Sequence, residues 1–340
     1  MKNNFGHLLD GTAVSLYTIS DGGISAVICD LGASVYRLYV PDHQGHPADV
    51  VLGFPDPMDY VRSTSFMGCV IGRSANRLQG AAFRLNGREY RLEANENGHN
   101  NLHSGNAFYK DRVWTVLDHT ATSISLVLDS PDGDQGYPGN AKICVTYTIE
   151  NGRALHISYD GICDRDTVFN MTNHTYFNLA GHDHPEKAMQ QILSMPARFF
   201  TPSDAESIPT GECLPVEGTP MDFRCPKPIG QDIGQDYAPL HLQGGYDHNF
   251  EAFANPCATL SDPESGRSMA VITDCPGIQL YSGNFLNGES GKDGAVYCRR
   301  GGVCLETQFF PNALNHPEWD QPIVHAGERY HSDTVYRFVW

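Results

Sequence analysis

The 340-residue chain has no long apolar run and no cluster of basic side chains. No stretch approaches the roughly 20 consecutive apolar residues that a membrane-spanning helix requires. The 23 Lys and Arg are outnumbered by 40 Asp and Glu, which gives a formal net charge of −17. Such a field repels nucleic acid and anionic membrane surfaces, so we predict neither as a partner and favour a neutral small molecule.

Motifs of several well-known enzyme classes are also missing. The chain contains no G-x-S-x-G nucleophile elbow and no G-x-G-x-x-G dinucleotide motif. The pair Gly291-Lys292 is not a phosphate-binding loop, because Leu286 occupies the position of its first glycine and Asp293 that of its Ser or Thr. Nucleotide chemistry is therefore disfavoured.

The ten cysteines are scattered and form no C-x-x-C pair, and several lie within apolar runs such as residues 26–29 and 303–305. We predict that they are reduced packing residues, without a disulfide or a zinc site. The first residues lack the basic segment and apolar core of a secretory signal, which predicts a cytoplasmic protein.

Short strand-like runs dominate what the sequence does contain. It is 40% hydrophobic and has 16 Tyr and 16 Phe, enough for a large core. Its 34 Gly and 21 Pro interrupt runs of β-branched and aromatic residues, a texture typical of all-β proteins. Asn86-Gly87 and Asn151-Gly152 predict two hairpins, because a type I′ turn needs positive φ at both central positions. Further strands are predicted at residues 24–29, 35–40, 124–128, 269–273, 278–281, 303–309 and 334–340.

No shift in composition divides the chain, and no internal repeat is present. The Pro-rich residues 201–228 are interpreted as a long surface excursion and not as a linker between domains. We therefore predict a single domain over residues 1–340. Antiparallel strands in this number normally form two packed sheets, so the expected fold class is all-β, a large antiparallel β-sandwich.

Two segments carry candidate acid–base residues. Residues 170–181 crowd small polar and aromatic side chains around His174, although a histidine in a polar turn is the simpler interpretation of that residue alone. Residues 303–312 read as a strand whose alternation sets Glu306 among apolar neighbours. A solvent-facing glutamate on a one-sided sheet would give the same pattern.

Three further clusters combine hydrogen-bonding side chains with glycine or an aromatic residue. Their members with candidate binding roles are Asn76, Arg77, His103 and Asp247. Planar Arg, Asn, Asp and His groups satisfy fixed hydroxyl directions, while an aromatic ring covers the apolar face of a sugar. Taken singly, Arg77 could equally be a structural ion-pair partner, and His103 or Asp247 a turn residue.

Together these segments resemble the aldose 1-epimerase (galactose mutarotase) family, in the family's order and at about its spacing. The resemblance covers nearly the whole chain and includes residues 29–33, 49–54, 132–140, 208–211 and 276–284. It implies that Glu306 is the general base and His174 the general acid of an enzyme that opens and recloses the ring of a free hexose such as galactose or glucose. In the starting direction Glu306 would be ionised and His174 protonated. The implied substrate-binding residues are Asn76, Arg77, His103, Tyr176, Asp247 and Gln279.

The implied fold is the large galactose mutarotase-like β-sandwich of that family, and the implied reaction needs no redox cofactor or metal. His182-Asp183-His184 has the residue types of metal ligands, but it lies beyond the matched motif in a loop-like stretch, so we predict no metal site. The family's usual Leu-His-Gly-Gly appears as Leu-His-Ser-Gly at residues 102–105, and Asn312 replaces the usual Asp. These departures bear on the preferred sugar more than on the reaction.

Three alternatives stay open. A hexose-6-phosphate 1-epimerase would need basic side chains for the phosphate, and Arg299-Arg300 is the only adjacent basic pair. A non-catalytic carbohydrate-binding or sugar-sensing module would need the binding residues but no acid–base pair. A retaining glycosidase would need two carboxylates roughly 5 Å apart, whereas these motifs offer one Glu with one His. The sequence is compatible with a monomer and with a homodimer.

Overall fold

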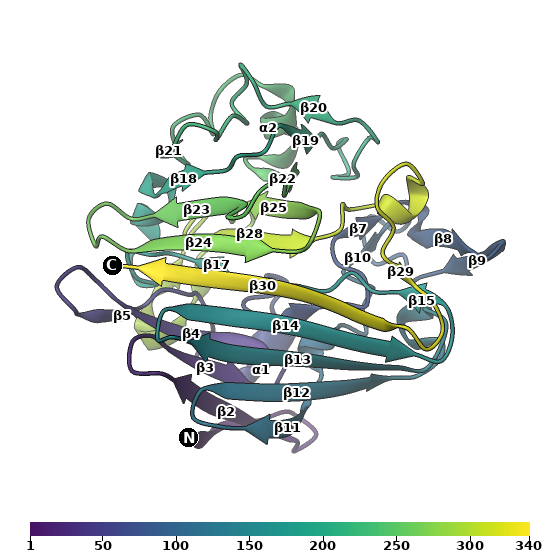
Figure 1. The fold of residues 1–340 in the computed structure, drawn as a ribbon, viewed down its shortest axis with the longest axis horizontal. Helices are drawn as coiled ribbons and strands as arrows, with labels where there is room; N and C mark the ends of the chain where they lie inside the picture. The colour runs from purple at the N-terminus through teal and green to yellow at the C-terminus, as the bar shows by residue number, and fades with distance from the viewer.

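The computed structural model describes residues 1–340, and β-strands make up almost all of its regular structure (Figure 1). Its only α-helices are α1 (Pro57–Arg62) and α2 (Ala238–Gln243), each six residues long. Asp56 caps α1 by accepting a hydrogen bond from the backbone N–H of Met58, and proline stands in the first turn of both helices. No helix is long and apolar enough to cross a membrane.

The largest sheet has nine antiparallel strands and forms one layer of the molecule, facing the viewer in Figure 1. Its long strands alternate buried and more exposed residues, the pattern of a sheet with one face on a core. In spatial order its strands are β11 (Thr115–His119), β12 (Ser123–Ser130), β13 (Ala141–Glu150), β14 (Ala154–Cys163), β30 (Arg329–Val339), β24 (Ser268–Thr273), β23 (Ala258–Ser261), β18 (Ile192–Ser194) and β21 (Lys227–Pro228).

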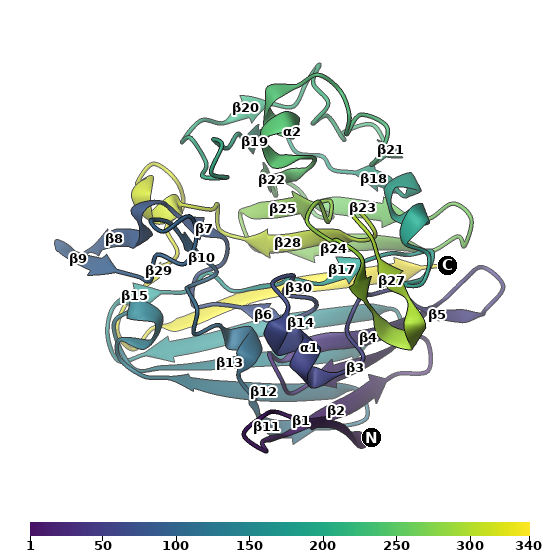
Figure 2. The same ribbon diagram turned by 180° about the vertical axis from the view of Figure 1, so that it is seen from behind.

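Two smaller antiparallel sheets lie behind this layer, as the view from the other side in Figure 2 shows. The five-stranded sheet consists of β1 (Lys2–His7), β2 (Ala13–Ser20), β3 (Ser25–Cys29), β4 (Ser34–Pro41) and β5 (Pro47–Asp49). The six-stranded sheet consists, in spatial order, of β17 (Tyr176–Phe177), β28 (Val303–Gln308), β25 (Gly277–Tyr281), β22 (Asp247–Glu251), β19 (Phe199–Thr201) and β20 (Leu214–Pro215).

Side-chain contacts join the two layers. The Tyr336 hydroxyl of β30 donates to the backbone oxygen of Leu305 in β28 at 3.1 Å. The Tyr147 hydroxyl of β13 donates to the carbonyl of Ala33, just before β4, at 2.6 Å. One hydrophobic cluster of 54 buried residues has members from all three large sheets, so these sheets share a core. The predicted large antiparallel β-sandwich is confirmed.

Five two-stranded ribbons complete the fold. The clearest is the predicted type I′ hairpin, in which Asn86 and Gly87 have φ values of 51° and 77°. Asn151 and Gly152, in the other predicted hairpin, also have positive φ. The ribbons pair β8 (Ala82–Leu85) with β9 (Arg88–Arg91), β7 (Arg77–Leu78) with β10 (Asn101–Leu102), β6 (Val70–Ile71) with β16 (Thr172–Asn173), β15 (Thr167–Val168) with β29 (Ile323–Val324), and β26 (Glu289–Ser290) with β27 (Val296–Tyr297).

The other predicted strands are confirmed to within two residues at each end, except that β30 begins five residues before the predicted start at residue 334. The interpretation of residues 201–228 as a surface excursion is wrong in part. Val216, Met221 and Phe223 from this segment are buried in the main core, and Phe223 packs edge-on against Phe250 of β22. The prolines and polar residues of the segment suggested exposure, but three apolar side chains anchor it to the sandwich.

Candidate active site

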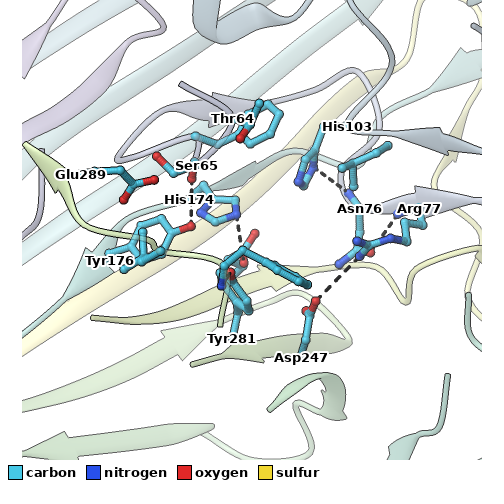
Figure 3. Close-up of a pocket in the computed structure, with 15 residues that line it drawn as sticks. Thr64, Ser65, Asn76, Arg77, His103, His174, Tyr176, Asp247, Tyr281 and Glu289 are labelled. Carbon is cyan, nitrogen blue, oxygen red and sulfur yellow. Dashed lines mark hydrogen bonds and ion pairs between the residues drawn. The ribbon is translucent and has the colours of Figure 1, made fainter. Parts of the chain in front are cut away.

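A cavity opens beside the six-stranded sheet and, together with the open space at its mouth, measures about 600 Å³. Segments that are far apart in the sequence converge here. Seven of the eight residues proposed from the sequence line the cavity, namely Asn76, Arg77, His103, His174, Tyr176, Asp247 and Glu306 (Figure 3).

The strands of the six-stranded sheet place two carboxyl groups on one face. Register sets Glu306 of β28 opposite Gln279 of β25. It also sets Asp247 of β22 opposite Tyr281 of β25. Because residues two apart on β25 share a face, Glu306 and Asp247 both point toward the cavity, while Leu305 points into the core. Glu306 is only 2% exposed, so the alternative of a solvent-facing glutamate is wrong.

His174 lies in the short connection between β16 and β17, and its ring is held in one orientation. Its backbone N–H and carbonyl are both hydrogen-bonded to residues 68–69. The ring packs on Tyr176, with centroids 5.1 Å apart, and its Nδ1 is 3.5 Å from the sulfur of Cys304. Nε2 is thereby directed toward Oε1 of Glu306, which is 3.8 Å away.

Burial shifts both members of this pair toward their neutral forms. Desolvation raises the pKa of Glu306 well above its usual value; the nearby Asp247 adds to the effect and Arg77 opposes it. Desolvation lowers the pKa of His174 to about 4. These shifts oppose the ionised Glu306 and protonated His174 expected from the sequence. In both cases, however, the two side chains share one proton: it is on Glu306 in the neutral pair and on His174 in the charged pair. Transfer of this proton between the two side chains interconverts the two states.

His103 and Asn76 form a fixed edge of the cavity. The backbone N–H of Asn76 donates to the ring Nδ1 of His103 at 3.1 Å, and the backbone N–H of His103 donates to the Asn76 carbonyl. A backbone N–H can only donate, so Nδ1 is the acceptor and the ring proton lies on Nε2. Burial lowers the pKa of His103 well below its usual value. The ring therefore presents a neutral N–H donor, suited to a hydroxyl oxygen.

Arg77 lines the cavity and also forms ion pairs, so its structural role is confirmed and its sugar-binding role stays a prediction. Its Nε is 2.9 Å from Oε2 of Glu96, and a terminal nitrogen is 3.8 Å from Oδ2 of Asp247. Burial raises the pKa of Asp247, while Arg77 and Gln279 act in the opposite direction. Glu96, which fixes the guanidinium, carried no signal in the sequence.

Gln279 is the one proposed binding residue that does not line the cavity. Its side-chain amide donates to Oδ1 of Asp247 at 2.7 Å. The amide therefore fixes the direction of that carboxylate. This geometry gives Gln279 a positioning role, and the direct sugar contact expected from the sequence stays a prediction.

Sequence reasoning missed several cavity residues. The Tyr176 hydroxyl donates to the Ser65 carbonyl at 2.9 Å, and Tyr281 packs edge-on against His174. Phe285 is 68% exposed at the mouth. Ser, Thr and aromatic residues are too frequent for their type alone to mark a site. The remaining lining residues are Thr64, Ser65, Phe66, Leu102, Tyr281, Phe285, Leu286 and Glu289.

His174, Cys304 and Glu306 each present one potential metal ligand, and the three atoms lie within 4.8 Å of one another. Burial raises the pKa of Cys304 well above its usual value. The expectation that the site holds no metal stays a prediction. His182, from the other stretch considered for a metal, contacts the Tyr297 hydroxyl at 3.0 Å.

Comparison with known sequences points to one family along the whole chain. The family model for aldose 1-epimerase matches residues 15–337. Galactose mutarotase of Sus scrofa is 39% identical over 345 residues, which cover 99% of this chain and 98% of the relative. Aldose 1-epimerase of Haemophilus influenzae is 37% identical, with 97% of each chain covered.

Solved structures show the same relationship. An aldose epimerase homologue from C. elegans has a TM-score of 0.88 and 29% identity, covering 96% of this chain and 99% of its own. A galactose 1-epimerase from Lactobacillus acidophilus has a TM-score of 0.86 and 27% identity, covering 100% of this chain and 98% of its own. Sequence, fold and cavity agree, and the chain belongs to the aldose 1-epimerase family.

Proposed function

We propose that this protein is an aldose 1-epimerase, or mutarotase, which interconverts the α and β anomers of a free hexose such as galactose or glucose. The observation that carries the proposal is the buried pair, in which His174 Nε2 and Glu306 Oε1 face each other 3.8 Å apart inside the cavity. One group can take a proton while the other delivers one, as the opening of a hemiacetal requires.

In this mechanism Glu306 is the general base and His174 the general acid. Glu306 removes the proton of the anomeric hydroxyl, the bond between C1 and the ring oxygen breaks, and His174 protonates that oxygen. The product is the open-chain aldehyde with a free C5 hydroxyl. After rotation about C1–C2, this hydroxyl adds to the other face of the carbonyl. His174 then takes the proton back while Glu306 returns its own to the new anomeric oxygen.

The groups around the pair match the remaining parts of a sugar. His103 donates from Nε2, Asp247 accepts, and Arg77 donates from a guanidinium that Glu96 holds in place. Tyr281 and Phe285 supply aromatic surface for the apolar face of the ring. The hydroxyl groups of a bound sugar, which point in different directions, thus face protein donors and acceptors that are held in fixed orientations.

Replacing Arg77 by Lys is expected to raise KM about tenfold and to lower kcat much less. Lysine keeps the charge but cannot bind Glu96 through Nε while a second nitrogen faces Asp247. Initial rates of optical-rotation change over a series of sugar concentrations measure both constants. Arg198→Lys, at an exposed ion pair outside the cavity, is the matched control. Equal losses in kcat and kcat/KM would instead assign Arg77 to the transition state.

The pH profile of kcat/KM is expected to be bell-shaped, because the pair must hold a single proton. As the pH falls below about 4, His174 is protonated while Glu306 is already neutral, and the base is lost. As the pH rises through the elevated pKa of Glu306, the pair loses its proton and the acid is lost. Polarimetry across the acidic and alkaline range measures both limbs. An acid limb at about 6.5, the ordinary histidine value, would contradict the burial of His174 in the working enzyme.

The charge of the cavity disfavours the hexose-6-phosphate alternative. Arg77 is the only Lys or Arg that lines the cavity, and Glu96 and Asp247 already neutralise it. Arg299 and Arg300 donate to a backbone carbonyl and do not line the cavity. A phosphate group would meet no unpaired cation.

Polarimetry on freshly dissolved galactose, glucose and glucose 6-phosphate tests the proposal against its alternatives. Purified protein should hasten the drift in rotation of a free hexose beyond its spontaneous rate. A larger effect on glucose 6-phosphate would favour the phosphate-specific enzyme. Sugar binding without any acceleration would favour a sensing module.

The same proposal includes a single domain over residues 1–340, supported by the core that all three large sheets share. The partner is a small-molecule sugar. A cytoplasmic location, a monomeric or homodimeric state, and independence of metal, cofactor, nucleic acid and membrane stay predictions.

A further inference from the structure

Glu289 is the one carboxyl group of the cavity that the proposed mechanism does not use. It lies in β26, opposite Tyr297 of β27, and lines the cavity with Ser65 and Tyr176. Figure 3 shows Glu289 and Arg77 at opposite ends of the site. A bound sugar therefore lies between them.

Glu289 also lines an adjoining surface groove that contains Asp59, Arg62 and Ser63. Thr64 and Glu289 belong to both the cavity and the groove, so they form the rim between the two. A substituent that extends from a bound sugar toward the groove must pass the Glu289 carboxyl group.

The carboxyl group of Glu289 has no partner in the protein. Its Oε2 is fully buried without a hydrogen bond. Burial alone raises its pKa to about 7, and its charge helps to raise the pKa of Tyr176, which lies nearby. A half-buried carboxyl group without a partner destabilises the folded state. A ligand that donates a hydrogen bond would relieve this cost.

The hairpin that carries Glu289 is firmly anchored. Lys292, three residues further on, is fully buried and donates to the Asp49 carboxylate at 2.6 Å. It also donates to the backbone oxygens of Tyr36 and Val51 at 2.7 and 2.8 Å. The Glu289 side chain is thus presented from a fixed backbone, which reduces the entropy lost when a ligand binds.

Charge is unevenly distributed along the cavity. At one end Arg77 is balanced by Glu96 and Asp247. At the other end no basic residue lines the cavity beside Glu289, and in the adjoining groove Arg62 is paired with Asp59 at 3.8 Å. A cationic substituent on the sugar is attracted to this end, and an anionic one is repelled.

We propose that Glu289 contacts the substrate and selects it by charge, so that the enzyme accepts aldoses bearing a protonated amine and rejects uronic acids. The inference rests on the proposed mutarotase function and deepens it. With a neutral hexose, Glu289 accepts a hydrogen bond from a hydroxyl. With an aminodeoxy sugar, that hydrogen bond is charge-assisted and stronger.

The experiment compares the unmodified protein with Glu289→Gln on galactose, galactosamine, N-acetylgalactosamine and galacturonate. Glutamine keeps the shape of the side chain and removes its charge. Glu212→Gln, at an exposed glutamate that forms no ion pair and lines neither the cavity nor the groove, removes one negative charge elsewhere and is the matched control. Polarimetry gives KM and kcat, and titration calorimetry gives Kd, for each protein and sugar.

In Glu289→Gln, KM relative to galactose should rise about fivefold for galactosamine if C2 lies next to Glu289, or fall about fivefold for galacturonate if C6 does. The ratio for N-acetylgalactosamine, which carries no charge, should stay unchanged. Unchanged charge-dependent ratios in Glu289→Gln, or equal changes in Glu212→Gln, would overturn the proposal. If the protein does not turn over galactose at all, the proposed mutarotase function is refuted instead. The ratios of Kd between each charged sugar and galactose then test charge selection by Glu289 separately.

Discussion

Replacing Glu306 by Gln is expected to lower kcat for mutarotation by about 10³-fold, within the range of 10²–10⁴ typical of one general acid or base. Glutamine has nearly the same size and preserves the pairing of β28 opposite Gln279. Its amide cannot take the proton of the anomeric hydroxyl, so ring opening loses its base. Polarimetry on freshly dissolved α-galactose, with the spontaneous rate subtracted, measures the loss.

The fold and the sugar affinity should change little in Glu306→Gln. Burial already favours the neutral form of this side chain, and its Oε2 has no hydrogen-bond partner in the protein. Glu251→Gln, on the same sheet but paired with Arg198 outside the cavity, is the matched control and should keep full activity. Near-normal turnover in Glu306→Gln, with sugar binding intact, would exclude Glu306 as the base.

Local patterns were sufficient to predict the strands and the isolation of Glu306 within one of them. They could not predict which strands pair. Asp247 lies on the same face of the sheet as Glu306 because β22 pairs with β25 and β25 pairs with β28, in a register set by distant segments. The same register places Gln279 against Asp247, where it positions the carboxylate. The direct sugar contact expected of Gln279 rests on the family resemblance and stays a prediction.

The chemical state of each group depends on neighbours that residue type does not reveal. His103 is a fixed N–H donor because the backbone of Asn76 occupies its Nδ1. Glu289 sits between a glycine and a serine, and no pattern marks it. It becomes a cavity residue because buried Lys292 anchors its hairpin to Asp49. The lowered pKa of His174 likewise follows from its burial in the folded protein, which residue type alone does not reveal.

Replacing His174 by Asn is expected to lower kcat by about 10²–10⁴-fold. Asparagine leaves a polar group near the Cys304 sulfur but ends short of the Nε2 position that faces Glu306. No side chain then protonates the ring oxygen as the hemiacetal opens. The rate on α-galactose measures the loss, and an unchanged unfolding temperature shows that the fold is intact. A variant that keeps more than about a tenth of the activity would exclude His174 as the acid.

The double variant Glu306→Gln/His174→Asn distinguishes a coupled pair from two independent groups. Since a single proton is shared between the two side chains, either replacement alone removes the one competent state of the site. The double variant should therefore be about as slow as the slower single variant, because groups that act as a unit are not additive. If the two losses multiplied, each group would contribute separately, and the shared proton that defines the mechanism would be refuted.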